Sequence, residues 1–262
     1  MSNDPDRYVD AENLSEGWLE AVRLMRGVPS RKVVHLLVRI RRPDVEDPQI
    51  RAEAQDLIDK HNSTKRERDW LCDIDTVRNT IFPTAWARRR PEPADLASYY
   101  RGFYTKNLLR GYEPNERGTY FGRIVAYPRE QDEPADQLTS TVEKLRDELK
   151  KGTNKSSRYE INIYNERKDG SPMGFPCLAH LSVHQHDGRL HLQAIYRNEY
   201  MVGRAYGNYL GLAQLQTYMA TAAGLTVGEL LVTIGHAQLD GQLKPIDAML
   251  GRHPLVPSPS SS

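Results

Sequence analysis

The sequence predicts an α/β protein, and three segments lead to that prediction. Residues 180–192 alternate apolar and polar side chains around Asp187-Gly188, a dipeptide that closes tight hairpins, so they indicate two paired strands. Residues 208–223 form a long apolar stretch rich in Leu, Ala and Met, which is typical of a buried helix. Residues 229–234 form a short apolar run that indicates a buried strand. No convincing linker divides the chain, so we expect a single α/β domain over residues 1–253.

The remaining elements follow from the same periodicities. Ser15 is the predicted N-cap of the first helix, and apolar residues at helical spacing identify a helix that ends near Lys150. The expected helices cover residues 15–25, 48–61, 70–77, 91–104 and 137–150, and the further expected strands cover residues 33–40, 159–164 and 190–196. Residues 1–10 indicate a frayed start. Residues 254–262 are rich in Pro and Ser, cannot form a core, and are expected to be disordered.

Composition and charge exclude several classes of protein. The 262 residues include 36 basic and 35 acidic side chains, a net charge of +1, so we expect no nucleic-acid polymer and no anionic membrane as a partner. No stretch approaches the length of a membrane span, and the polar first ten residues do not resemble a signal peptide. The two cysteines lie far apart, without metal-site spacing, which fits a reducing compartment. We therefore expect a cytoplasmic protein.

Cys177 is the first candidate functional residue. It follows Gly174-Phe175-Pro176 and lies directly before the predicted hairpin, at the entrance to a sheet. A thiol at this place either fills the core, as free cysteines often do, or is presented to a cleft as a nucleophile.

Four histidines follow Cys177 closely and raise the question of a metal site. His180, His184 and His186 share one face of the predicted strand, whereas His191 lies beyond the turn. Because the sequence places no carboxylate at ligand spacing beside them, hydrogen-bonded surface histidines are favoured, and no metal is predicted.

Two arginines and one asparagine are the other candidates. Arg158 and Arg197 lie at predicted strand ends, where a guanidinium can bind a phosphate with two parallel hydrogen bonds or form a surface ion pair. Asn208 begins the apolar helix, where it is either an N-cap or an amide that presents a donor and an acceptor to the edge of a pyrimidine ring.

Placed in chain order, these residues belong to one pattern. Its segments are Asp136-Gln137-Leu138, Ser156-Ser157-Arg158, Ile163-Tyr164-Asn165, Phe175-Pro176-Cys177, Asp187-Gly188, Arg197 and Asn208, with Gly118-Thr119-Tyr120-Phe121-Gly122 upstream. The pattern resembles thymidylate synthase and its relatives, the deoxycytidylate and cytidylate hydroxymethylases. The intervals from Cys177 through Asp187-Gly188 and Arg197 to Asn208 match that family without a gap.

The resemblance implies a large mixed sheet packed with helices, a homodimer formed sheet to sheet, and a mechanism. Cys177 would add to C6 of a pyrimidine nucleotide 5′-monophosphate, and C5 would then accept a one-carbon unit from 5,10-methylenetetrahydrofolate. Arg197, with Asn198 beside it, would bind the phosphate, together with Arg158 of the neighbouring subunit. Asn208 would read the base, and an asparagine there implies uracil. Gln238 and Asp240 would bind the sugar.

The chain also departs from the family pattern. Phe121 occupies the position of the tyrosine that the family associates with proton removal at C5, although Tyr120 is adjacent. Tyr200 replaces an aspartate that helps to hold the folate ring, and a Pro/Ser tail stands where the family has an apolar segment that closes over the cofactor.

Three functions follow as alternatives. The first is transfer of a methyl or hydroxymethyl group to C5 of a uridine-type monophosphate. The second is a folate-independent enzyme that keeps the cysteine adduct. The third is a catalytically silent homodimer that binds nucleotides.

Overall fold

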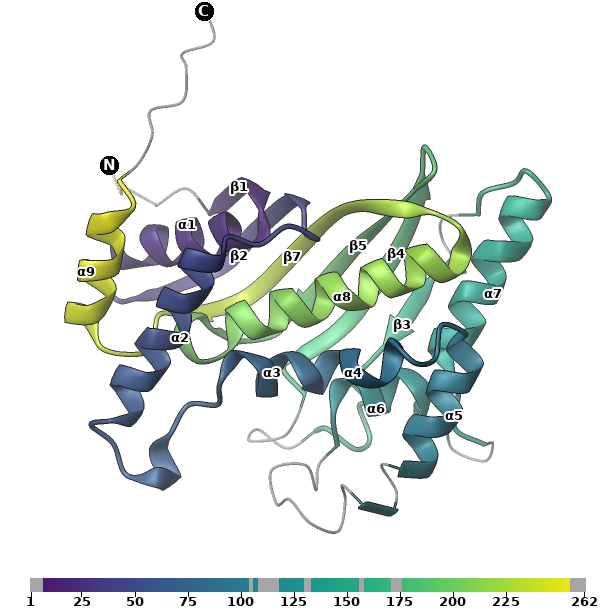
Figure 1. Ribbon diagram of the computed structural model, residues 1–262, viewed down its shortest axis with the longest axis horizontal. Coiled ribbons are helices and arrows are strands. Elements are labelled where there is room, and N and C mark those ends of the chain that lie inside the picture. Colours follow the sequence, from purple (N-terminus) through teal and green to yellow (C-terminus); the bar gives the residue numbers. More distant parts are fainter. Residues whose placement is uncertain are drawn as a thin grey trace, which may run out of the picture.

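A seven-stranded mixed sheet forms the centre of the protein (Figure 1). The computed structural model describes residues 7–103, 106–107, 118–129, 133–155, 158–170 and 176–254. The strands are β1 (Tyr8–Asn13), β2 (Lys32–Arg42), β3 (Glu160–Asn162), β4 (Leu178–His186), β5 (Arg189–Tyr196), β6 (Glu199–Tyr200) and β7 (Thr226–Gln238). Their order across the sheet is β1-β2-β7-β5-β4-β3, and β6 pairs with β7. The predicted α/β class with a large mixed sheet is therefore confirmed.

Strand β7 joins the two halves of the sheet. It pairs antiparallel with β2 on one side and parallel with β5 on the other, and β6 continues beside its C-terminal end. Strands β4 and β5 form the predicted hairpin, with Asp187 and Gly188 both at positive φ in the turn. Because β5, β6 and β7 end near one another, the residues that follow them gather at one edge of the sheet.

The helices lie mainly on one face of this sheet (Figure 1). They are α1 (Leu14–Arg26), α2 (Pro48–Asn62), α3 (Ile74–Ile81), α4 (Thr84–Ala87), α5 (Pro93–Phe103), α6 (Tyr120–Val125), α7 (Gln137–Lys150), α8 (Tyr206–Ala223) and α9 (Leu243–Arg252), with a 3₁₀ turn at Glu67–Asp69 and a π-helical turn at Met201–Ala205. Helix α8 crosses the sheet and contacts both β5 and β7.

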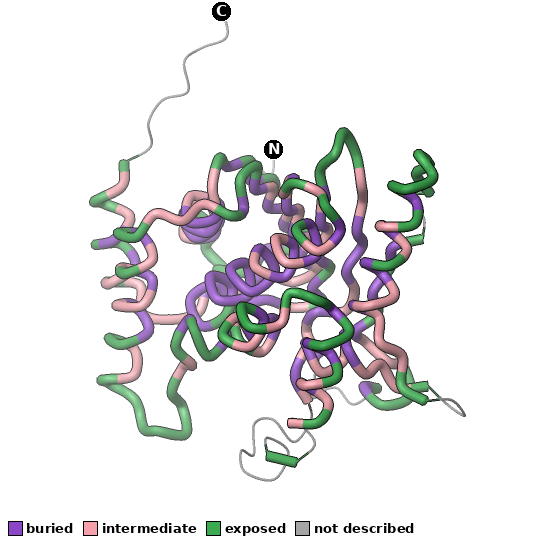
Figure 2. The backbone as a smooth tube through the Cα atoms, turned by 45° about the vertical axis from the view of Figure 1, so that its right-hand side comes forward, coloured by how far each residue is buried: buried purple, intermediate pink, exposed green. Residues whose placement is uncertain are grey.

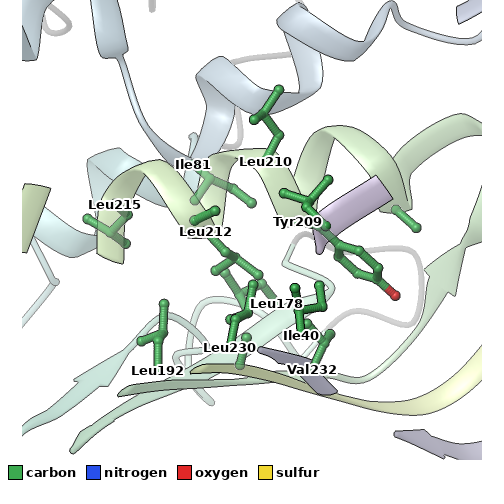
Figure 3. Close-up of a cluster of buried hydrophobic side chains, with 14 of the residues drawn as sticks. Ile40, Ile81, Leu178, Leu192, Tyr209, Leu210, Leu212, Leu215, Leu230 and Val232 are labelled. Atoms are coloured by element: carbon green, nitrogen blue, oxygen red, sulfur yellow. The ribbon is translucent and has the colours of Figure 1, made fainter. Parts of the chain in front are cut away.

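Helix α8 is buried along most of its length, as Figure 2 shows. Its apolar side chains meet those of the central strands in one continuous core, in which Leu178 and Tyr209 are both buried (Figure 3). Leu178 directly follows Cys177, and Tyr209 directly follows Asn208. Packing of these two neighbours therefore anchors both candidate residues to the same core.

Two glycines allow α8 to approach α3 closely. A Cβ atom added at Gly207 would lie 2.7 Å from the Ile74 carbonyl oxygen and 2.7 Å from the Val77 Cβ atom. At Gly211 it would lie 2.8 Å from the Ile81 Cβ atom. Both distances are shorter than real Cβ contacts, so the absence of a side chain at these positions fixes the separation of the two helices.

The opposite face of the sheet carries partly exposed side chains. Leu37 pairs with Thr233, and Thr233 also pairs with Ile195, so these residues are neighbours on adjacent strands. Ile195 is 37% exposed, and Val34 on β2 is 48% exposed. We refer to the face that carries these exposed side chains as the open sheet face.

Helix starts differ from the sequence prediction in two places. Asn13, not Ser15, caps α1 by accepting a hydrogen bond from the Glu16 N–H, because the helix begins one residue earlier than predicted. Ser15 is fully buried instead and its hydroxyl lies 2.8 Å from the Tyr206 hydroxyl. Asn208 is not an N-cap, because a π-helical turn precedes α8 and places Asn208 inside its first turn.

Other boundaries show where the linear pattern is incomplete. Helix α7 has the predicted bounds, whereas β7 is longer and β3 shorter than predicted. The prediction of a frayed start is wrong for residues 8–10, which form part of β1 beside β2, and residues 70–73 are not helical. The predicted disordered tail begins at Pro254, and all of its residues after Pro254 lie outside the described residues. Within the described chain, no helix has the length and apolar character that crossing a bilayer requires.

Candidate active site

Cys177 lies directly before β4, half-buried and packed against the edge of the core. The Arg197 N–H donates a 2.8 Å hydrogen bond to the Cys177 carbonyl oxygen, so the end of β5 fixes the backbone of the cysteine. The thiol is thus neither fully buried filler nor a freely exposed group. Of the predicted motif that leads to it, Gly174 and Phe175 lie outside the described residues.

The Arg197 side chain lies beside the same segment. Its guanidinium donates hydrogen bonds of 3.1 and 2.6 Å to the Pro176 carbonyl oxygen and lies 4.8 Å from the centre of the Tyr164 ring. Tyr164 also lines a cavity of about 580 Å³ whose wall includes Arg129 and Lys168. Arg197 itself does not line this cavity, whose wall also includes Glu166, and Tyr164 is the residue that the two share. A guanidinium beside this wall could bind an anionic group such as a phosphate.

Asn198 and Gln238 meet in a polar cluster at the ends of β5 and β7. The Gln238 amide donates a 2.6 Å hydrogen bond to the Asn198 side-chain oxygen, and His236 Nδ1 lies 3.0 Å from the same atom. The structure therefore brings together two predicted site residues, and His236 joins them as a third polar group.

Asp240, which the resemblance assigns to the sugar, binds backbone N–H groups of its own chain. Its two carboxylate oxygens accept hydrogen bonds of 2.7 and 3.0 Å from the N–H groups of Val202 and Gly203. These bonds cap the turn that leads into α8, where free backbone N–H groups favour a negative charge. Burial nevertheless raises the pKa of Asp240, and the two backbone bonds oppose that effect.

Asn208 forms a buried pair with Glu199. Its amide donates a 2.7 Å hydrogen bond to Glu199 Oε1, and the two residues are only 4% and 2% exposed. Asn208 Oδ1 and Glu199 Oε2 are both buried and have no hydrogen-bond partner among the described residues. Burial raises the pKa of Glu199 to about 8, although the Asn208 bond and the charge of Arg204 oppose the shift.

Tyr120, at the first position of α6, belongs to the same site. Burial raises the pKa of its hydroxyl, and the nearby Cys177 and Glu199 raise it further. The hydroxyls of Tyr196 and Tyr209 are buried without a hydrogen-bond partner among the described groups, and Glu199 also raises the pKa of both. Glu199 is therefore surrounded by neutral phenols.

The pKa of the Cys177 thiol reflects these neighbours. Burial raises it first and Glu199 raises it further, whereas Arg197 and Arg204 lower it. In the protein without ligand, the thiol is therefore held in its protonated form. A bound group that separates Glu199 from the thiol, or that neutralises it, would favour the thiolate.

Arg158 does not reach this site within its own chain. It forms an ion pair with Glu148 on α7, which is buried and also accepts a hydrogen bond from the Thr153 hydroxyl. These contacts lower the pKa of Glu148, with Thr153 making the largest contribution. The prediction that Arg158 acts in a neighbouring subunit remains a prediction, and Ser156 and Ser157 before it lie outside the described residues.

The histidines of β4 have partners on the neighbouring strand β3 and on β4 itself. His180 Nε2 lies 2.5 Å from Glu160 Oε2 on β3, and His184 Nε2 lies 3.1 Å from the Ser182 hydroxyl. The carboxylate that linear spacing did not reveal is thus supplied by strand pairing. Across the described ranges, no group of three or more His, Cys, Asp or Glu side chains is arranged to hold a metal ion.

Sequence reasoning missed two charged residues of the site, Glu199 and Arg204. Glu199 directly follows Arg197-Asn198, and an acidic residue at the edge of a strongly apolar segment was the available signal. Arg204 lies in the π-helical turn, a local irregularity that periodicity does not reveal.

A further cavity, of about 640 Å³, lies along α8 next to Phe82 and Tyr218, and no predicted site residue lines it.

Fold and site together define a class of protein. This is an α/β protein in which a cysteine at the start of a strand lies beside an arginine, an asparagine and a buried carboxyl group. The family model described as thymidylate synthase matches residues 82–261, more than half of the chain. The chain therefore belongs to the thymidylate synthase family, as the resemblance predicts.

Two curated proteins from archaea are similar to this chain, and each is named "Putative thymidylate synthase". The protein from Methanocaldococcus jannaschii is 28% identical over 160 residues, which cover 58% of this chain and 69% of that protein. The protein from Methanothermobacter thermautotrophicus is 26% identical over 129 residues, which cover 49% of this chain and 54% of that protein. The alignments thus span about two thirds and about half of the two relatives.

Proposed function

We propose that the protein transfers a one-carbon unit, methyl or hydroxymethyl, to C5 of a uridine-type nucleotide 5′-monophosphate through a Cys177 adduct at C6. The observation that carries this proposal is the meeting of Cys177, Arg197 and the Asn208–Glu199 pair at one edge of the sheet. Family membership supports a transferase that acts on a uridylate.

The proposed chemistry begins at the thiol. Cys177 loses its proton, and the sulfur forms a bond to C6 while the electrons of the C5–C6 double bond move toward C5 and O4. C5 would then form a bond to the one-carbon unit while the bond between that unit and its carrier breaks and leaves its electrons on the carrier. Loss of the C5 proton re-forms the C5–C6 double bond, and the sulfur leaves with the electrons of the C6–S bond. A unit at the oxidation level of formaldehyde gives hydroxymethyl by addition of water, whereas methyl also requires a hydride from the carrier. Tyr120, whose hydroxyl is close to Cys177, is the group that we propose relays the C5 proton, because a neutral hydroxyl can accept that proton while it donates its own.

Each polar group of the site has a proposed role toward the nucleotide. Arg197, which contacts Tyr164 in the wall of a cavity that also includes Arg129 and Lys168, would bind the 5′-phosphate. Asn208 would hydrogen-bond the edge of the base. Asn198 and Gln238, already joined by a hydrogen bond, would bind the phosphate and the sugar hydroxyl respectively, and Asp240 would support the sugar from its capping position.

The residues at the expected cofactor position fit folate less well. Tyr200 is 44% exposed and stands where the resemblance implies an aspartate, so this position supplies no carboxylate to accept the N–H bonds of a pterin ring. 5,10-Methylenetetrahydrofolate, which would supply the one-carbon unit when bound, stays a prediction. Tyr200 also favours the second candidate, a folate-independent enzyme that keeps the cysteine adduct.

We further propose that the chain acts as a homodimer through the open sheet face. Apolar side chains on this face, including Ile195 on β5 and Val34 on β2, are partly exposed and lie on the two strands that flank β7. A second copy packed there would bury them and would bring its Arg158 toward the Cys177 site of the first. On this proposal residues 1–253 act as one domain.

The test is a calorimetric titration of the purified protein with UMP, dUMP, CMP and dCMP, each with and without methylenetetrahydrofolate. Binding of a uridine nucleotide that the folate strengthens supports one-carbon transfer. Binding that is indifferent to folate supports the folate-independent enzyme. Absence of binding to all four nucleotides contradicts both.

Two cysteine variants then test the adduct. We expect Cys177→Ser to abolish turnover, because a hydroxyl is a far weaker nucleophile than a thiolate at neutral pH. Cys72→Ser, the matched control, should retain turnover because Cys72 is absent from the contacts of the site. Retained activity in Cys177→Ser would contradict the adduct, and denaturation curves of both variants show whether they are folded.

A further inference from the structure

Glu199 has a buried carboxylate oxygen that no described residue contacts by a hydrogen bond. Its Oε1 accepts the Asn208 amide hydrogen bond, whereas its Oε2 has no partner among the described residues, and the same holds for Asn208 Oδ1. Buried polar atoms nearly always have a hydrogen-bond partner, so two unpartnered atoms on two joined side chains indicate groups that a ligand completes. Both residues are more than nine-tenths buried.

We propose that Glu199 is a second base-reading residue, which together with Asn208 determines whether the site binds a pyrimidine with a keto or an amino group at C4. This inference rests on the proposed function, because it takes the ligand to be a pyrimidine nucleotide with its base at Asn208. It extends that function by assigning the choice of base to a residue that the sequence pattern did not identify.

The two forms of the carboxyl group match the two bases. Uracil presents an N–H donor at N3 and an acceptor at O4, which suit Asn208 Oδ1 and a protonated Glu199 that donates from Oε2. Cytosine presents an acceptor at N3 and an amino donor at C4, which suit the Asn208 amide N–H and an ionised Glu199. An ionised carboxylate opposite O4 would repel uracil, so one side chain can favour either base.

The surroundings of Glu199 favour the protonated form at neutral pH. Burial raises its pKa to about 8, so the carboxyl group is mainly neutral at pH 7. The titratable and charged groups that face it from the packed elements are Tyr120, Cys177, Tyr196, Arg204, Tyr209 and Asp240. Of these, Arg204 favours the carboxylate and Asp240 opposes it. We therefore expect uracil to be preferred at pH 7.

A purely structural role of Glu199 would not require a carboxyl group. Holding Asn208 in place requires only Glu199 Oε1, and a glutamine would accept the same hydrogen bond with its side-chain oxygen. A carboxyl group adds the ability to change from donor to acceptor at Oε2. The experiment therefore measures base preference against pH rather than affinity alone.

The experiment compares the dissociation constants of UMP and CMP from pH 6.5 to 8.5 by calorimetry. Both nucleotides carry the same phosphate, so its titration cancels in their ratio. A Cys177→Ala background, used throughout, removes the titration of the thiol, and the range stays below the pH at which uracil loses its N3 proton. The variant is Glu199→Gln, and the matched control is Glu53→Gln, since Glu53 lies on α2 and binds Arg252 and His253 there.

The expected result is a preference for UMP over CMP that falls as pH rises. The ratio of ionised to neutral carboxyl changes about 10-fold per pH unit, so the preference should fall by up to about 100-fold over the range. In Glu199→Gln, whose amide donates permanently toward O4, the preference should stay with UMP and be independent of pH. The Glu53→Gln control should follow the parent.

Two results would overturn the proposal, and they are distinguishable. Binding of both nucleotides with a ratio that does not change with pH in the parent protein overturns the role of Glu199 and leaves the proposed function intact. Absence of any nucleotide binding overturns both. The pH series of the Cys177→Ala parent needs no change at Glu199, so the test stands even where Glu199→Gln does not fold.

Discussion

Replacement of Gly207 by alanine tests whether the close approach of α3 and α8 positions the site. The new Cβ atom would lie 2.7 Å from the Ile74 carbonyl oxygen and 2.7 Å from the Val77 Cβ atom. Carbon atoms normally approach to about 3.5–4.0 Å, so one helix must move by about 1 Å. Neither contact is the end of a flexible side chain, and α8 is held against β5 and β7 on its other side.

Two opposing contributions set the magnitude of the effect. Overpacking of a close contact costs about 1–3 kcal/mol, whereas alanine in place of glycine inside a helix gains up to about 1 kcal/mol. Because both contacts involve atoms that cannot rotate away, the upper part of the overpacking range, about 2–3 kcal/mol, applies here. After the gain from alanine, we expect Gly207→Ala to lower the free energy of unfolding by about 1–2 kcal/mol. Because Asn208 is the next residue, a shift of α8 should also weaken nucleotide binding.

The assay is urea denaturation followed by circular dichroism, at one fixed protein concentration because association adds to apparent stability. Gly251→Ala in α9 is the matched control, since a Cβ atom there would meet nothing within 4 Å. That control should be neutral or more stable by up to about 1 kcal/mol. If Gly207→Ala were as stable as the parent, the close contact would not limit the position of α8, and the reasoning would be wrong.

Two further predictions concern buried acidic groups. Because the pKa of Glu199 is raised to about 8, the folded protein keeps a proton that the unfolded chain has lost at intermediate pH, so this residue's contribution to stability falls as pH rises toward 8. The free energy of unfolding of Glu199→Gln should therefore rise relative to that of the parent as pH increases from 5.5 to 7.5, by up to about 1.4 kcal/mol per pH unit. Urea denaturation at each pH measures this difference. A difference that does not change with pH would contradict the raised pKa. Asp240→Ala should lower the free energy of unfolding by about 1–2 kcal/mol, because it removes the acceptors of the Val202 and Gly203 N–H groups. Asp240→Asn keeps one acceptor and should lower that free energy by less in the same assay. Equal losses in the two variants would exclude capping as the reason.

Much of the fold was predictable because local patterns determine it. Helix α7 and the β4–β5 hairpin depend on periodicity and on a turn dipeptide, which act within a few residues. Strand β1 was missed because its polar, acidic sequence becomes a strand only by pairing with β2. The start of α1 was displaced because Ser15 bonds to distant groups rather than to its own helix.

The site was predictable in its spacing but not in its charges. Family spacing identified Cys177, Arg197 and Asn208, which the structure places at the same edge of the sheet. Glu199 was not found, because what distinguishes it is burial beside Asn208, a consequence of β6 pairing with β7 and of the turn before α8. A raised pKa depends on such three-dimensional surroundings, which a linear sequence does not display.

The central position of β7 has a consequence for how the chain reaches this structure. Strand β2 has β7 as its neighbour, with Lys32 opposite Gln238, so the two halves of the sheet can join only after residues 226–238 have left the ribosome. Pairing of segments so distant in sequence is slow to form. During synthesis, the edge of β2 that pairs with β7 therefore stays unpaired until most of the chain has been made, and Gln238 can reach its position beside Asn198 only after that pairing.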